Sequence, residues 1–328
     1  MSPFLQWGIP VIQWMQSLGT WLEPIMQFFT FLGTENFYLL ILPIFVWWID
    51  IGFGIRIGLG LLFSAVANSI LKVIFGLPRP YWVSDQIKAF SSESSFGLPS
   101  GHAQNALVLW GLIAARSKKR WFQGAMIFLI LMITVSRNYL GVHFPSDSIV
   151  GLVVGGLILW AMIRLETPIR SRIKELVLGQ QILIAVIVSM VLLGIGLGSL
   201  YITRERPIPT EWFEQAAQAT STHGEAEPID PTSSESIIAN VATLSGISIG
   251  ALMLLDWGQF KAEGTWGQRI GRYVIGLIGL VLLFFGLRLV FPVEPAWIGA
   301  IFRFIRYALV GFWVAYLAPR LFVEIRLA

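Results

Sequence analysis

The stretch from Lys72 to Asp147 contains three polar clusters: Lys-Val-Ile-Phe-Gly-Leu-Pro-Arg-Pro at 72–80, Pro-Ser-Gly-His at 99–102, and Ser-Arg-Asn-Tyr-Leu-Gly-Val-His-Phe-Pro-Ser-Asp at 136–147. Each cluster lies beside an end of a long apolar block. Together they supply cations, two histidines, a serine at a helix start and a carboxylate. Side chains of these kinds can hold a phosphate group and displace it through a histidine.

The surrounding sequence is typical of a membrane protein. The chain has 328 residues, of which 55% are hydrophobic and only 13% are charged. Its apolar blocks of roughly 16 to 23 residues approach the ~20 that cross a bilayer as a helix, in which every backbone hydrogen bond is satisfied. The sequence therefore predicts an all-α fold, a polytopic bundle of membrane helices. The absence of cysteine excludes disulfides, a thiol nucleophile and a cysteine metal site.

Four regions are expected along the chain. Residues 1–34 are apolar but broken by prolines, and we expect an amphipathic segment in the membrane interface. Residues 35–202 form a six-span core that carries the three clusters, 203–236 form an acidic loop, and 237–328 add three helices. The nine expected spans are 35–50, 54–75, 101–116, 121–141, 148–164, 180–202, 237–255, 271–291 and 297–318.

The charges of the loops predict the orientation. Residues 116–120 carry four cations and no acid, and residues 164–175 carry four cations against two acids, so both loops are expected in the cytoplasm. The acidic loop and all three clusters then share the opposite face. We therefore expect an N-terminus outside, a cytoplasmic C-terminus, and a site that faces outward from a bacterial inner membrane.

The first cluster contributes Lys72 and Arg79. Because Pro78 and Pro80 oppose a continuous helix, Arg79 is expected where the helix unwinds. Arg79 can bind phosphate oxygens through two hydrogen bonds, and Lys72 can act as a point charge. Taken alone, a basic residue near a helix end more often snorkels to lipid headgroups. Asn68 either orients Lys72 or simply packs between helices.

The second cluster predicts an anion site at a helix start. Ser100 is expected to be the N-cap residue, and Gly101 allows the backbone to approach a ligand closely. Their N–H groups and the helix dipole favour an anion, and His102 is placed to give a proton to a leaving oxygen. The alternative is an ordinary helix start followed by an interfacial histidine.

The third cluster pairs His143 with Asp147, four residues later. The carboxylate can accept the Nδ1 proton and leave Nε2 free as a nucleophile, or the pair only satisfies two polar groups at a helix start. Arg137 would be the third cation, and Ser136 is expected to pack or to bind Arg137. The remaining histidine, His223, is expected to be solvated in the acidic loop.

In order and spacing, the clusters resemble the signature of the type-2 phosphatidic acid phosphatase superfamily: Lys-x6-Arg-Pro, Pro-Ser-Gly-His and Ser-Arg-x5-His-x3-Asp. The resemblance covers roughly residues 30–165. It implies a phosphatase that needs no metal and no cofactor and that works through a phosphohistidine on the third-cluster histidine. The phosphate-binding residues that it implies are Lys72, Arg79, Ser100, Gly101 and Arg137, and the catalytic residues are His143, His102 and Asp147.

The resemblance implies a lipid phosphate or diphosphate as substrate, with membrane lipids as the other partners and no nucleic acid. The nine-span layout and the string at 75–82 are also similar to the glucose-6-phosphatase branch, so a sugar phosphate is an alternative. Phosphotransfer to an alcohol and, against the intact site, a non-enzymatic lipid transporter are further alternatives. The sequence does not specify an oligomeric state.

Three arginines near the outer ends of the last two spans form a second candidate site. Arg288, Arg303 and Arg306 could together hold a lipid headgroup or a diphosphate, since charges at membrane depth are costly. The simpler interpretation, which we favour, is snorkelling or pairing with Glu294.

Overall fold

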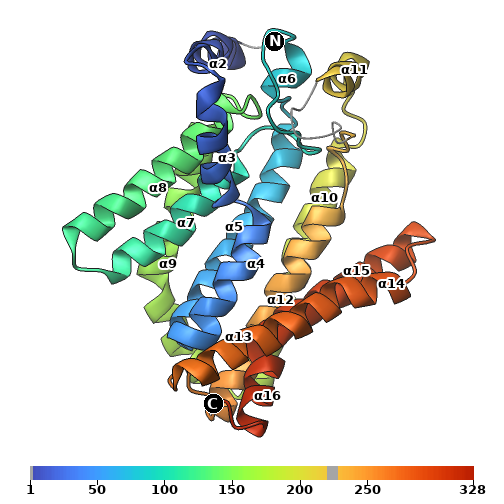
Figure 1. Ribbon diagram of the computed structural model, residues 1–328. Helices are drawn as coiled ribbons and strands as arrows, with labels where there is room; N and C mark the ends of the chain where they lie inside the picture. The colour runs from blue at the N-terminus through green and yellow to red at the C-terminus, as the bar shows by residue number, and fades with distance from the viewer. Residues whose placement is uncertain (1–2, 220–227) are drawn as a thin grey trace. The chain divides into compact units, whose positions relative to one another are not determined.

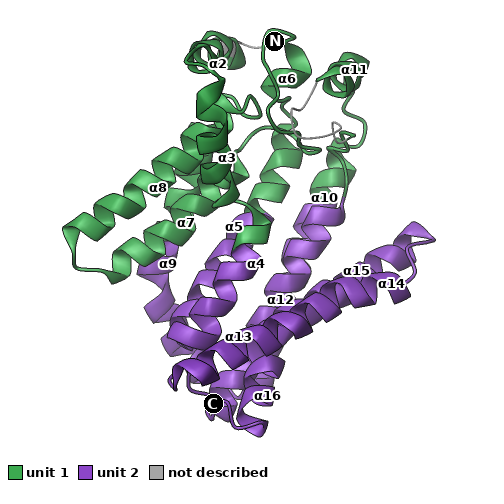
Figure 2. Cartoon of the chain, in the orientation of Figure 1, with its two compact units in different colours: residues 1–37, 67–160, 198–233 green, residues 38–66, 161–197, 234–328 purple. Residues whose placement is uncertain are grey.

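The computed structural model describes residues 3–219 and 228–328, and it confirms the all-α fold: no strand occurs within these residues. The chain divides into two compact units (Figure 2). Unit 1 comprises residues 1–37, 67–160 and 198–233, and unit 2 comprises 38–66, 161–197 and 234–328. The three polar clusters of the sequence all lie in unit 1.

Unit 1 begins with four short helices, α1 (Pro3–Gln6), α2 (Gly8–Ser17), the 3₁₀ helix η1 (Thr20–Leu22) and α3 (Glu23–Phe31) (Figure 1). Its other helices are the end of α5 (Ile51–Phe75), α6 (Pro80–Val83), α7 (Gly101–Arg116), α8 (Arg120–Tyr139), the first half of α9 (Pro145–Lys174), the end of α10 (Leu178–Thr203) and α11 (Thr210–Gln218).

Two features hold together the part of unit 1 that carries the polar clusters. An aromatic core includes Trp82 and Phe90, and the ring of Phe90 stacks on Tyr139 with centroids 5.6 Å apart. Helix α9 packs tightly on the start of α7, because a Cβ at Gly151 would lie 2.6 Å from the carbonyl oxygen of Ser100. Only glycine fits at such an approach, so the start of α7 is fixed against α9.

Unit 2 contains α4 (Glu35–Ile44) from residue 38 onward and the parts of α5, α9 and α10 outside unit 1. It continues with the long helices α12 (Glu235–Trp257), α13 (Trp266–Val281) and α15 (Ala296–Phe312), and with the short helices α14 (Leu287–Val290) and α16 (Ala318–Glu324). Three π-helical turns interrupt the regular helices: η2 (Phe45–Ile49), η3 (Leu282–Gly286) and η4 (Trp313–Leu317).

Close helix contacts and an indole hydrogen bond order unit 2. Helices α12 and α15 approach so closely that a Cβ at Gly246 would lie 2.0 Å from the carbonyl oxygen of Ala308. The indole of Trp47 donates to the carbonyl of Val314 in η4 at 2.9 Å. A π-turn leaves some carbonyls without their usual N–H partner in the helix, and here the indole N–H of a tryptophan is the donor to one of them.

Seven of the described helices are long and apolar enough to cross a membrane, and the bent pair Thr20–Phe31 and Glu35–Ile49, at 49°, would make an eighth. The described helices that meet the length and hydropathy requirements of a span are therefore fewer than the nine spans that the sequence predicted. Helix α7 has only 16 residues, short of the ~20 of a full crossing, and the expected span 35–50 is one arm of the bent pair.

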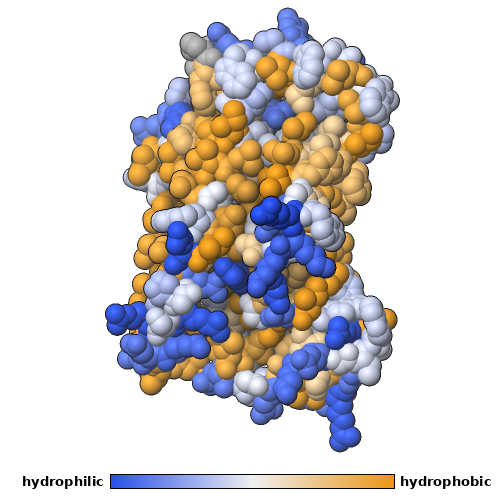
Figure 3. All heavy atoms as spheres, turned by 90° about the vertical axis from the view of Figure 1, so that its left-hand side faces the viewer, coloured by the Kyte–Doolittle hydropathy of each residue, from blue (hydrophilic) through white to orange (hydrophobic). Residues whose placement is uncertain are grey.

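The expected span 148–164 was also too short. Helix α9 continues to Lys174 and includes Pro168, so residues 164–174 are helical rather than a loop. The exposed surface fits a bilayer: hydrophobic side chains cover much of the face in Figure 3. On α8, for example, Ile127, Phe128 and Leu131 are each more than half exposed. The chain is therefore a multi-pass membrane protein, whereas the interfacial placement of residues 1–34 stays a prediction.

Candidate active site

The first cluster follows the end of helix α5. The helix stops because Gly76 adopts a left-handed φ of +59° and prolines follow it. Arg206 donates hydrogen bonds to the carbonyls of Val73 (3.3 Å) and Ile74 (2.9 Å), which the helix end leaves without helical partners. Arg79 then lies in extended backbone immediately before α6, where the two prolines predicted it.

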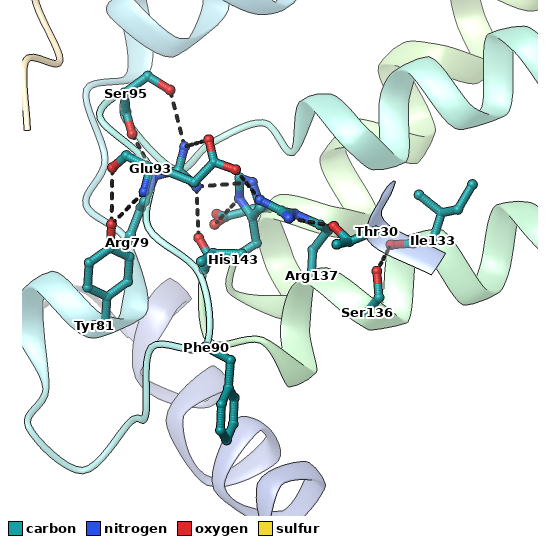
Figure 4. A network of polar contacts seen from close by, with 12 residues as sticks. Thr30, Arg79, Tyr81, Phe90, Glu93, Ser95, Ile133, Ser136, Arg137 and His143 are labelled. Carbon is teal, nitrogen blue, oxygen red and sulfur yellow. Dashed lines mark hydrogen bonds and ion pairs between the residues drawn. The ribbon is translucent and has the colours of Figure 1, made fainter. Parts of the chain in front are cut away.

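Arg79 is fully buried and connects two parts of the site (Figure 4). Its guanidinium donates to the carbonyl of Ser95 at 2.6 Å, to the Ser95 hydroxyl at 3.1 Å and to the carbonyl of Phe96 at 3.2 Å. On the other side, Nη1 of Arg79 donates to the carbonyl of Val142 at 2.9 Å and lies 3.2 Å from Nε2 of His143. The arginine therefore reaches the candidate nucleophile.

The second cluster opens helix α7. Ser100 occupies the N-cap position, and its N–H donates to the carbonyl of Asp147 at 3.0 Å, which joins the second cluster to the third. Its hydroxyl does not cap the helix, in contrast to our expectation. Ser100 Oγ and His102 Nε2 are instead buried without a hydrogen-bond partner among the described residues. An unpaired buried polar atom costs about 1–3 kcal/mol, so both atoms favour a ligand.

The third cluster forms a hydrogen-bonded pair at the start of helix α9. His143 Nδ1 lies 3.3 Å from Asp147 Oδ2, and the same oxygen accepts the N–H of Phe144 at 2.9 Å. Asn138 donates to the carbonyl of His143 at 2.9 Å and fixes its backbone. The contact with Asp147 favours a proton on Nδ1, which leaves the lone pair of Nε2 toward Arg79.

Arg137 lies at the end of helix α8 and is 2% exposed. One guanidinium nitrogen donates to the hydroxyl of Thr30 in helix α3 at 2.5 Å, and the other forms an ion pair with Glu93. Glu93 also lies 3.7 Å from the guanidinium of Arg79. Two predicted phosphate ligands therefore share one carboxylate (Figure 4).

The site includes residues that the sequence analysis did not identify. Ser95 accepts a hydrogen bond from Lys72 Nζ at 2.8 Å in addition to those from Arg79. Thr30 and Glu93 complete the surroundings of Arg137. No motif in the sequence distinguishes Ser95 or Thr30 from other serines and threonines. Glu93 had one signal, since it is the single acidic residue between Asp85 and Asp147.

Burial and charge set the protonation of two groups in the loops of the site. Burial lowers the pKa of His143 well below its usual value, and the nearby cations Arg79 and Lys72 lower it further. Burial alone would raise the pKa of Glu93, but the charges of Arg137 and Arg79 outweigh it and hold that pKa below its usual range. His143 is therefore a neutral base near neutral pH, and Glu93 is an anion.

Three other expectations have different outcomes. Asn68 does not contact Lys72 in any described hydrogen bond; it donates to the carbonyl of Pro99 at 3.1 Å and to the side chain of Gln104 at 3.0 Å, and so holds the start of α7. Ser136 donates to the carbonyl of Ile133, not to Arg137. His223 lies outside the described residues.

The three arginines of the second candidate site have separate surroundings in unit 2. Arg303 pairs with Glu235 rather than with Glu294. The guanidinium of Arg306 lies over the rings of Phe284 and Tyr307, at 5.8 and 5.1 Å from their centroids. Arg288 is exposed in α14. A shared anion site at these positions stays a prediction.

The arrangement can hold an anion and act on it. The cations Lys72, Arg79 and Arg137 lie around the imidazole of His143 and the start of α7, all within unit 1. Within residues 3–219 and 228–328, no group of three or more His, Asp or Glu side chains is arranged to hold a metal ion. The positive charges of the lysine and the two arginines can neutralise a phosphate.

Sequence comparisons agree with this geometry. The PAP2 superfamily model matches residues 53–170, which carry all three clusters, and the model of the PAP2 superfamily phosphatase transmembrane extension matches residues 238–328. Glucose-6-phosphatase 3 from Homo sapiens is 27% identical over 190 residues, which are 49% of this chain and 54% of the human protein. This chain therefore spans about half the length of that relative.

Phosphatidylglycerophosphatase B from Bacillus subtilis is 30% identical over 159 residues, which are 42% of this chain and 72% of the relative. The crystal structure of the transmembrane PAP2-type phosphatidylglycerolphosphate phosphatase from Bacillus subtilis matches with a TM-score of 0.44 and 25% identity, over 51% of this chain and 89% of that chain. Since one family model covers the clustered residues and a second covers the helices of the C-terminal region, this chain belongs to the PAP2 superfamily.

Proposed function

We propose that the protein is a membrane phosphatase that hydrolyses a lipid phosphate or diphosphate through a phosphohistidine on His143, without a metal ion. The observation that carries this proposal is the buried contact between His143 and Asp147. This contact favours the imidazole proton on Nδ1, which would leave Nε2 as the nucleophilic atom beside the Arg79 guanidinium.

The reaction would proceed in two displacements at phosphorus. In the first, His143 Nε2 bonds to phosphorus, the bond to the leaving oxygen breaks, and His102 gives that oxygen a proton. Asp147 stabilises the positive charge that develops on the imidazole. In the second, water attacks the phosphohistidine while His102 accepts a proton, so inorganic phosphate leaves and His143 is restored.

Electrostatic stabilisation supplies the remaining part of catalysis. The phosphoryl oxygens gain charge in the transition state, and Lys72, Arg79 and Arg137 are fixed around them before substrate binds. Ser100 Oγ and the N–H groups at the start of α7 are the neutral donors for the same oxygens. Donors that are already in position need no reorganisation during the reaction.

A lipid is the substrate class that we favour. Arg79, Arg137 and Asp147 belong to the ends of membrane-length helices, where a lipid phosphate lies at the bilayer surface, and a relative is Phosphatidylglycerophosphatase B. The basic loop 116–120 supports an active site on the outer face. Because another relative is Glucose-6-phosphatase 3, a sugar phosphate is the second candidate.

The decisive test is phosphate release by the purified protein with EDTA present. The substrates would be phosphatidate, phosphatidylglycerophosphate, undecaprenyl diphosphate, sphingosine phosphate and glucose 6-phosphate. His143→Ala should lower release by roughly 10³-fold or more while the melting temperature stays close to that of the wild type. Release that requires a divalent metal, or that survives His143→Ala, would overturn the proposal, and transfer to an added alcohol would show phosphotransfer.

A further inference from the structure

Arg206 lies in a segment that neither family model covers, yet it contacts the helix end that carries Lys72. The first matched region ends at residue 170 and the second begins at residue 238. From between them, the Arg206 guanidinium donates to the carbonyl of Val73 at 3.3 Å and to that of Ile74 at 2.9 Å. These two residues directly follow Lys72 in helix α5, so the arginine holds the turn that carries a proposed phosphate ligand.

The end of α5 takes its hydrogen-bond donors from Gly76 and from Arg206. The carbonyl of Lys72 accepts the N–H of Gly76 at 2.9 Å, and Arg206 supplies donors to the next two carbonyls. A helix leaves its last carbonyls without helical partners, and a cation at this end also interacts favourably with the helix dipole. Gly76 makes room for the guanidinium, since a Cβ there would overlap Nη1 of Arg206. Loss of the guanidinium would therefore loosen the last turn of α5.

Lys72 depends on this turn more than the other two cations of the site do. The guanidinium of Arg79 donates to three carbonyls, and that of Arg137 pairs with a hydroxyl and a carboxylate. Among the described residues, the Lys72 ammonium has a single hydrogen-bond partner, the hydroxyl of Ser95 at 2.8 Å. An ammonium on a flexible four-carbon stem with one such contact takes its position mainly from the backbone that carries it.

Contacts on both sides hold the Arg206 segment in place. The N–H of Arg206 donates to the carbonyl of Thr203 at 3.0 Å, at the end of α10. Farther along the chain, helix α11 packs on α6, where the rings of Trp212 and Trp82 have centroids 6.2 Å apart. The segment is thus fixed to α10 and to α6, and its arginine joins both to the end of α5.

We propose that Arg206 is a positioning residue for the proposed reaction: it holds the last turn of α5, and so keeps the Lys72 ammonium beside Ser95 for a substrate phosphate. Arg206 acts through Lys72 and does not itself touch the phosphate. A cation that is already in position needs no rearrangement when the anion binds, so a displaced ammonium binds less well although its charge is unchanged. The inference rests on the phosphate-binding role proposed above for Lys72.

The test is a double-mutant cycle between Arg206 and Lys72, measured as affinity for inorganic phosphate. Isothermal titration calorimetry on the full-length protein in detergent at pH 7 would give dissociation constants for the wild type, Arg206→Gln, Lys72→Ala and the double variant. We expect Arg206→Gln to weaken binding by about fivefold, the upper end of what a charge at a helix terminus contributes. In the Lys72→Ala background the same substitution should change the constant by less than about twofold, because the side chain that it positions is absent.

Arg204→Gln is the matched control. Both arginines are exposed in the same loop, but Arg204 pairs with Glu205 and lies over the ring of Tyr201. Its substitution removes the same charge without a contact to α5, and should leave phosphate binding close to that of the wild type. A long-range attraction between Arg206 and the phosphate would, in contrast, persist in the Lys72→Ala background.

Arg206→Lys replaces Arg206→Gln in the cycle if the glutamine variant does not fold. Its ammonium is a point donor in place of a fork across two carbonyls, so binding should weaken by about twofold, and only when Lys72 is present. The inference is overturned if the folded Arg206 variant binds phosphate as the wild type does, if Arg204→Gln weakens binding equally, or if the loss persists in full without Lys72. Binding needs no turnover, so a wild type that binds phosphate through Lys72 but releases none from substrates contradicts only the proposed function.

Discussion

The imidazole of His143, just before helix α9, contacts the carboxylate of Asp147 in the first turn of that helix, with 3.3 Å between Nδ1 and Oδ2. The carboxylate is fully buried, and the same oxygen accepts the N–H of Phe144. Asp147→Asn can keep the bond from Phe144 but removes the charge that stabilises an imidazolium. We expect kcat to fall by about 10² to 10⁴-fold with little loss of stability.

The measurement is single-substrate kinetics on the best substrate of the panel, together with the melting temperature. Asp256→Asn is the control, because Asp256 is exposed in α12 of unit 2 and the same chemical change there should leave kcat unchanged. A fall in kcat of less than threefold for Asp147→Asn would mean that Asp147 does not assist His143.

The pH dependence follows from the neutral state of His143. Burial and the charges of Arg79 and Lys72 favour the unprotonated imidazole, so its pKa lies well below 6.5. The nucleophile then stays active in mildly acidic solution, and the acid limb of kcat/KM should fall below pH 6.5. A limb centred at pH 6.5 or above in a profile from pH 4 to 9 would contradict this.

The free energy of unfolding should decrease in acid, because two groups of the site have lowered pKa values in the folded protein. His143 and Glu93 both bind a proton less readily in the folded protein than in the unfolded chain. The contribution of His143 is therefore complete above about pH 6.5 and that of Glu93 above about pH 4.5, and each is lost as the pH falls. Melting temperatures should fall less steeply below pH 4.5 in Glu93→Gln than in the wild type.

Much of the site could be predicted because its residues follow local rules. The prolines on either side of Arg79 predicted that it lies outside the helix. The four-residue spacing predicted the contact between His143 and Asp147. The start of α7 at Gly101 was predicted from Ser100, which precedes the helix, and from Gly101 itself. Each of these relationships joins residues only a few positions apart, so their spacing in the sequence is enough to predict the contact.

The remaining features depend on contacts between distant segments. Glu93 and Ser95 lie in a loop without hydrophobic periodicity, and Thr30 comes from a helix about a hundred residues before its partner Arg137. Nothing in the local pattern of any one segment specifies these contacts. Residues 164–175 were expected to form a charged loop, but helix α9 continues through them to Lys174 and accommodates Pro168.

Tyr81 offers a way to loosen the Glu93 loop without a change of charge. Its hydroxyl makes two hydrogen bonds with the backbone of Glu93, each 3.0 Å long. Tyr81→Phe should cost about 1 kcal/mol of stability, since a partly buried N–H and carbonyl lose their partner. It should also raise KM, because Glu93 and Ser95 are then less firmly held against the Arg79 guanidinium.

The control is Tyr139→Phe. The Tyr139 hydroxyl donates to the carbonyl of Gly19 at 2.8 Å, and the ring packs in the same core. This variant should lose a comparable amount of stability with an unchanged KM. Equal KM values in both variants, measured at a temperature where each is folded, would show that the Glu93 backbone does not need the tyrosine.

Gly33 tests whether the N-terminal helices form a wall of the site. A Cβ at this position would lie 2.8 Å from Cδ2 of His102 and 2.9 Å from Cγ2 of Ile133. Gly33→Ala must therefore displace the imidazole, and we expect kcat to fall at least about tenfold, because small misplacements of a catalytic group are costly. Gly124→Ala is the matched control, since no atom lies within 4 Å of a Cβ there, and alanine in a helix should add about 0.5–1 kcal/mol of stability. If kcat is unchanged in Gly33→Ala while both variants fold, the close approach of Gly33 does not position His102, and the wall contributes to packing alone.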